Sequence, residues 1–247
     1  MNVSLDINSL HLNDADVSSD LTAEIIQQVE LIYGLISRAS IPVRPYTPKS
    51  IQILLSLNRE KKVKIRQHLQ SWSSILMSAD GPLEKVDERH MANKALGYFN
   101  FRLKNYDWQD TSSDQIIEIY NPEGIQLYRS LNFFKTCGYS LLDLCVNEWF
   151  VLWERPKAVI DKMFSAVKDI ISGQRTNYKF DEIGPHLIRE TYDDGTTQPF
   201  QPMAAIVEFK NIYPAYSLDK KYIIGFVCTS VAKVIAVGDE TLKIDFI

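Results

Sequence analysis

Aromatic residues between positions 134 and 164 are the part of this chain whose types and spacing best suit a binding site. Aromatic side chains with a few polar tips are typical of small-molecule pockets. Aromatic bulk also dominates ordinary hydrophobic cores, so the same residues fit a packed core without a ligand. Trp149 and Trp153, four residues apart, share one face if their segment is helical. The set consists of Phe134, Tyr139, Trp149, Phe150, Trp153 and Phe164.

The sequence lacks the common motifs of catalysis and of metal binding. The chain has no Gly-rich phosphate loop, no GxSxG or HExxH motif and no paired Cys/His ligands. We therefore expect neither enzymatic activity nor a metal site. His186 lies on a predicted strand from which it could approach a cavity, although a lone histidine is more often a surface or hydrogen-bonded residue. The basic run at 59–66 lacks interleaved aromatics, so it is more typical of a solvated helix face.

The bulk composition is that of an ordinary globular protein. The 247 residues are 45% hydrophobic and 23% charged, with a formal net charge of −4. A chain without a basic field does not attract phosphates, so no nucleic-acid partner is expected. No segment has the roughly 18 uninterrupted apolar residues of a membrane span. The first residues do not resemble a signal peptide, and the three cysteines form no CxxC pair, so we expect a cytoplasmic location.

The spacing of apolar residues in the first half of the chain predicts helices. Residues 1–20 are polar and are expected to be a flexible arm, with Asp20 as the N-cap of an amphipathic helix. A second helical region should follow from Pro48, with a break near residues 58–62. We expect another helix at 83–104, so that 21–110 form a helical region.

The period of the pattern changes after the polar stretch 105–114, which we interpret as a domain boundary. Residues 115–234 are expected to form one domain and 235–247 a C-terminal tail. A hairpin around Asn121-Pro122-Glu123-Gly124 should open the domain. A helix should then run from Pro156 to Gly173. The remaining strands are predicted at 187–192, 203–209 and 222–228, the first reversal lying at Asp193-Asp194-Gly195-Thr196.

This order of elements resembles a PAS domain over about residues 115–234. The resemblance is carried by Gly138-Tyr139-Ser140 with Leu144 and Trp149-Phe150, by the long helix after Arg155-Pro156, and by Asp194-Gly195-Thr196 with Ile224-Gly225-Phe226-Val227. It implies an α+β fold, a PAS-like antiparallel sheet with flanking helices, preceded here by the N-terminal helical region.

The chain departs from the family pattern at several positions, which makes it a divergent member. Ser130 replaces a common asparagine and is expected to cap the first short helix. Val146 stands where a glycine is frequent, and Thr229-Ser230-Val231 replaces a common Asp-Ile-Thr. We expect Gly138 to end a helix in the left-handed conformation and Ser140 to cap the next helix.

The resemblance also implies which ligands to consider: flavin, haem, a small metabolite or none. Trp149 takes the position of the reactive cysteine of light-sensing flavin members, and the long helix has no histidine for haem. Photoactive flavin and haem are therefore disfavoured, and the cofactor stays unknown. The candidate pocket consists of Phe134, Tyr139, Trp149, Trp153, Phe164 and His186.

The functional expectation is a cytoplasmic sensory or regulatory protein. Its PAS-like domain would bind a small molecule or a partner and signal by a conformational shift to another protein. The alternative is a ligand-free interaction module that docks a protein partner or forms a homodimer in a regulatory complex.

Overall fold

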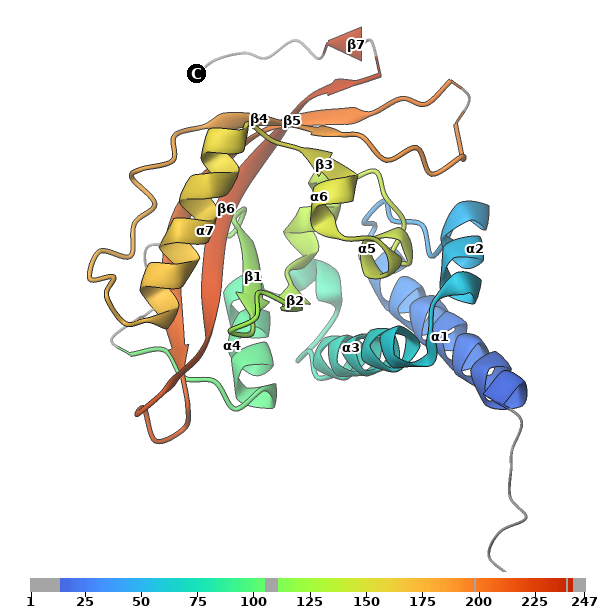
Figure 1. The fold of residues 1–247 in the computed structure, drawn as a ribbon, viewed down its shortest axis with the longest axis horizontal. Helices are drawn as coiled ribbons and strands as arrows, with labels where there is room; N and C mark the ends of the chain where they lie inside the picture. Colours follow the sequence, from blue (N-terminus) through green and yellow to red (C-terminus); the bar gives the residue numbers. More distant parts are fainter. Residues whose placement is uncertain (1–13, 105–110, 198, 239, 242–247) are drawn as a thin grey trace, which may run out of the picture.

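The protein has an α+β fold in which helices flank one curled antiparallel sheet (Figure 1). The structure is a computed structural model that describes residues 14–104, 111–197, 199–238 and 240–241. The helices are α1 (Asp14–Ser37), α2 (Pro48–Ser56), α3 (Arg59–Met77), η1 (Leu83–Lys85), α4 (Glu88–Tyr98), η3 (Leu131–Thr136), α5 (Asp143–Val146), α6 (Trp149–Leu152) and α7 (Lys157–Ile171). The strands are β1 (Ile116–Tyr120), β2 (Gln126–Arg129), β3 (Trp153–Glu154), β4 (His186–Glu190), β5 (Met203–Tyr216), β6 (Ile223–Val237) and β7 (Glu240–Thr241).

The first helix has the predicted buried stripe but an earlier start. Its apolar positions recur every three or four residues and face the core. The helix begins at Asp14, so the prediction of Asp20 as its N-cap is wrong. Residues 14–20 contain neither proline nor glycine, and the helix therefore continues upstream of the stripe. The buried residues are Leu21, Ile25, Val29, Ile32 and Ile36.

Local capping explains the next helix boundaries. Pro48 occupies the first turn of α2, and Thr47 and Ser50 form a capping box. Asn58 Oδ1 accepts a hydrogen bond from Lys61 N (2.9 Å), which starts α3 and confirms the predicted break. The helix predicted at 83–104 is shorter and divided. Asp87 caps α4, and Asn100 adopts a positive φ of 58° just beyond its end.

None of the helices in the described part of the chain is long and apolar enough to cross a membrane. Of the polar stretch predicted as a domain boundary, residues 105–110 lie outside the described residues.

The sheet has the strand order β2-β1-β6-β5-β4-β3, and β7 pairs with β6. The predicted hairpin of β1 and β2 is confirmed, with Gly124 at a φ of +77° in its turn. β5 and β6 are longer than the sequence predicts. Their pairing extends from Met203 opposite Val237 at one end to Tyr216 opposite Ile223 at the other. Register shifts interrupt this pairing at three places, and such bulges bend a strand and increase its twist.

β1 has buried or half-buried side chains on both of its faces. Ile117 and Ile119 are fully buried on the side of α4. Glu118 and Tyr120 point to the opposite side, because successive side chains of a strand alternate. One hydrophobic core therefore continues from α1 to β6.

Three predictions about the short helices are wrong. Gly138 does not have a positive φ. Its constraint is a close approach instead: its N–H donates to Glu190 Oε1 (2.6 Å), and a Cβ would lie 2.9 Å from Glu190 Oε2, so the end of that side chain would have to shift. Ser130 Oγ does not cap η3 but accepts a hydrogen bond from Ile117 N (2.9 Å). Ser140 Oγ accepts a hydrogen bond from Asp143 N (3.1 Å), the first residue of α5, but the N-cap position of α5 is Leu142 rather than the predicted Ser140.

Gly225 of β6 gives a test of the packing between the sheet and the chain segment after α4. A Cβ at this position would lie 2.7 Å from Phe101 Cε2 and would also meet the carbonyl of Tyr120. We expect Gly225→Ala to lower the free energy of unfolding by about 1–3 kcal/mol, measured by urea denaturation. Gly184→Ala is the control, because a Cβ there has no neighbour within 4 Å. Equal stability of the two variants would contradict this packing.

Candidate functional site

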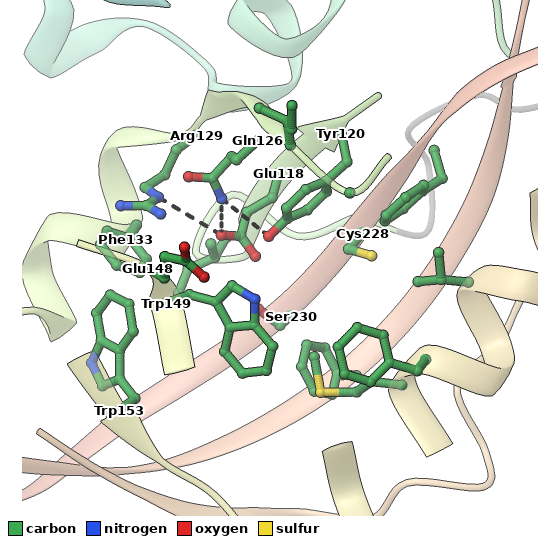
Figure 2. Close-up of a pocket in the computed structure, with 18 of the residues that line it drawn as sticks. Glu118, Tyr120, Gln126, Arg129, Phe133, Glu148, Trp149, Trp153, Cys228 and Ser230 are labelled. Carbon is green, nitrogen blue, oxygen red and sulfur yellow. Dashed lines mark hydrogen bonds and ion pairs between the residues drawn. The ribbon is translucent and has the colours of Figure 1, made fainter. Parts of the chain in front are cut away.

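A cavity of about 960 Å³ lies between the concave face of the sheet and the helices (Figure 2). Its floor is formed by side chains of β1, β4, β5 and β6, which include Ile188, Phe209 and Phe226. α7 closes one side, and the segment from α5 to β3 closes another. α3 contributes a third wall with Ile65 and His68. The volume is in the range of cavities that hold drug-sized molecules.

Three of the six residues predicted as the pocket line this cavity. They are Trp149, Trp153 and Phe164. Trp149 and Phe164 are neighbours, with ring centroids 6.2 Å apart. Phe164 is 60% exposed, so it lies at the rim. Together these rings form an aromatic wall that connects the interior with the mouth.

The other three predicted residues belong to the surrounding core and do not line the cavity. Phe134 stacks on Trp72 at 5.5 Å. Tyr139 is buried, and its hydroxyl donates to Leu152 O (2.7 Å) and accepts from Tyr192 N (2.9 Å). His186 stacks on Phe209 at 5.5 Å, with Nδ1 3.2 Å from Gly184 O. These residues pack in the layer around the cavity, as His186 does against the cavity-lining Phe209.

A polar cluster at the β1–β2 hairpin was not predicted from the sequence (Figure 2). Gln126 Nε2 donates to Glu118 Oε1 (2.5 Å) and to Tyr120 Oη (3.1 Å). Arg129 Nε lies 3.7 Å from the same Glu118 oxygen, and its guanidinium covers the ring of Phe133 at 3.9 Å. The sequence contained one indication of this cluster, because Glu118 is a single acidic residue between Ile117 and Ile119 of a predicted strand.

A second arginine reaches the cavity from the start of α7. Arg155 Nη1 lies 3.4 Å from Met163 Sδ, and the guanidinium is 5.7 Å from the ring centroids of Trp149 and Phe209. Burial lowers the pKa of Arg155, and the nearby carboxylate of Glu118 acts in the opposite direction. In the sequence, Arg155 indicated only the start of the long helix.

The two histidines near these arginines favour their neutral form. Burial and the charge of Arg129 lower the pKa of His68 to about 4. Burial also lowers the pKa of His186, to which the charge of Arg155 contributes. Neither histidine therefore supplies a charge to the site near neutral pH.

The cysteines of the cavity are protonated thiols. Burial raises the pKa of Cys145 to about 12, and it raises that of Cys228 as well. Because the thiolate is the reactive form, these residues act as small hydrophobic side chains.

Arg44, which precedes α2, and Lys49 in the first turn of α2 tie the helical region to loops around the cavity. Arg44 Nη2 donates to Asp194 Oδ2 and to Gly138 O, both at 2.7 Å. Lys49 Nζ donates to the carbonyl of Asp193 and lies 4.4 Å from the ring centroid of Tyr192. The Asp-Gly turn is thus held by residues more than a hundred positions away.

Comparison of the chain with protein-family models, with curated proteins and with solved structures finds no match.

Tyr139→Phe tests whether this residue serves the core. The variant removes the acceptor of the buried Tyr192 N–H and one of the two donors to Leu152 O, so we expect the free energy of unfolding to fall by about 1–3 kcal/mol. Tyr222→Phe, at a position 67% exposed, should change it by less than about 0.5 kcal/mol in the same urea titration. Unchanged stability of Tyr139→Phe would show that the hydroxyl has no structural role.

His68 gives a prediction for pH dependence. Its pKa is about 4 in the folded protein and 6.5 ordinarily, so folding favours the neutral form. The contribution is fully present above pH 6.5 and is lost as the pH falls towards 4. Between pH 7 and pH 5 the wild type should lose about 1–2 kcal/mol more unfolding free energy than His68→Gln.

The control for this measurement is Gln67→Ala, which changes an exposed neighbour of His68 on α3 and keeps the histidine. It should lose as much stability as the wild type over the same pH interval. An identical pH dependence of His68→Gln and the wild type would contradict the effect assigned to His68.

Proposed function

We propose that this protein is a sensory or regulatory protein that binds a small molecule in the cavity of a PAS-like region. The observation that carries the proposal is one cavity of about 960 Å³ with an aromatic wall and a polar cluster. Apolar walls with a few convergent polar groups are typical of binding sites for small organic molecules.

The order of elements supports the PAS-like interpretation. A hairpin is followed by short helices, then by the long helix α7, and finally by the antiparallel strands β4, β5 and β6. This is the order on which the resemblance rested, and the cavity lies between α7 and the sheet.

The proposed mechanism is a shift between conformations. A ligand in the cavity contacts α3 of the helical region and the sheet of the PAS-like region at the same time, through residues such as His68 and Phe209. It therefore favours the arrangement of these two parts that best fits it. The contacts of Arg44 and Lys49 would transmit the change to α2.

In this proposal the response is passed on by a conformational shift to another protein. We place this protein in the cytoplasm, which suits the three free cysteines.

Native mass spectrometry of protein purified from its host should reveal a bound small molecule. Ala232→Phe puts a phenyl ring into the cavity from β6, so this variant should carry no ligand. Lys233→Phe puts the same ring at the exposed neighbouring position and should retain the ligand. Metabolite extracts should raise the melting temperature of the wild type and of Lys233→Phe, but not that of Ala232→Phe.

The proposal fails if the wild type carries no extra mass and its melting temperature does not respond to the extracts. A stable dimer or a captured partner under the same conditions, measured by light scattering, would then favour the ligand-free interaction module.

A further inference from the structure

The charges that line the cavity are unequally compensated. Three charged groups of the interior are half-buried: Glu118, Arg129 and Arg155. Glu118 forms its ion pair with Arg129, at 3.7 Å. Within the described part of the chain, Arg155 differs from Arg129 in having no carboxylate within ion-pair distance, whereas the Nε of each arginine is buried without a hydrogen-bond partner. The interior therefore carries one positive charge that the protein does not neutralise.

The surroundings of Arg155 do not replace a counter-ion. Its nearest polar contact is the thioether of Met163, which is a weak acceptor. The rings of Trp149 and Phe209 lie 5.7 Å away and offer a moderate cation–π attraction. A half-buried charge without a hydrogen-bonded partner costs stability, so this arginine is a poor choice for stability alone.

The other charged groups of the cavity lie at its exposed rim and balance one another. They are Lys64, Lys168, Glu123 and Glu148. Side chains at the rim remain hydrated and contribute little to the charge balance inside. The two neutral histidines described above do not alter it either.

We propose that the cavity binds an amphipathic organic acid with a single negative charge, whose anionic group pairs with Arg155. This inference rests on the proposed function and names its ligand class. The planar guanidinium binds a carboxylate through two parallel hydrogen bonds. The apolar body of the acid would lie along Trp149, Trp153 and Phe164. One uncompensated charge matches a monoanion, whereas a phosphate dianion would require a further cation.

The test uses two fluorescent probes with the same anilinonaphthalene body. One is the anion 8-anilinonaphthalene-1-sulfonate, and the other is neutral N-phenyl-1-naphthylamine. We expect both to bind the wild type with one-to-one stoichiometry, and Ala232→Phe to abolish this binding. Arg155→Gln should lower the affinity for the anionic probe about tenfold and change the affinity for the neutral probe less than twofold.

Two further variants separate the role of Arg155 from general effects of charge and folding. Arg189→Gln removes the same charge from an exposed position of β4 and should leave both affinities unchanged. Arg155→Lys should retain most of the preference for the anion. The melting temperature of unliganded Arg155→Gln should not fall, because the wild-type charge has no ion-pair partner.

The outcomes distinguish the two proposals. If the neutral probe binds in the cavity and Arg155→Gln leaves the affinity for the anion unchanged, the organic-acid inference is overturned and ligand binding stands. If neither probe binds the wild type, both proposals are overturned. Arg155→Gln could also lose affinity for both probes and have a lower melting temperature. That result would assign this arginine a structural role and overturn the inference.

Discussion

The pairing of β5 with β6 is the interaction on which the rest of the structure depends. These strands form the centre of the sheet, and their register is shifted at three places. Such shifts let a long hairpin bend without losing its ladder of hydrogen bonds. The sheet curves around the space between α7 and the hairpin β1–β2, and the cavity of about 960 Å³ lies there.

Polar groups inside the cavity are placed by the same sheet. Alternation along β1 sends Ile117 and Ile119 into the core with α4 and sends Glu118 and Tyr120 into the cavity. The antiparallel partner β2 then brings Gln126 and Arg129 to the carboxylate. Arg155 comes from outside this arrangement, because it precedes the proline at the start of α7. Arg155 therefore feels the charge of Glu118 without coming within ion-pair distance of it.

The helical region is part of the site rather than an attachment to it. α1, α3 and α4 share one core with β1 and β6, and α3 supplies a wall of the cavity. A molecule that fills the cavity therefore touches residues from both halves of the sequence. In a packed interior such a contact is transmitted by discrete shifts of whole elements, because close-packed side chains do not deform continuously.

The sequence by itself determined the elements and part of the aromatic wall. Local signals sufficed for the hairpin turn at Gly124, the cap at Asn58 and the buried stripe of α1, because each depends on neighbours within a few residues. Trp149, Trp153 and Phe164 were identifiable as a group by residue type. Residue type did not distinguish them from Phe134 and Tyr139, which turn into the core.

Tertiary structure alone decided which residues face the cavity and which charges are paired there. Gly138 was assigned a backbone role from its residue type, whereas its actual constraint is the approach of Glu190 from a strand 52 residues away. The register of β1 and β2 places Gln126 and Arg129 next to Glu118. Arg155 precedes α7 and forms no ion pair with Glu118. Such relations depend on contacts between distant segments, for which a single sequence contains no local signal.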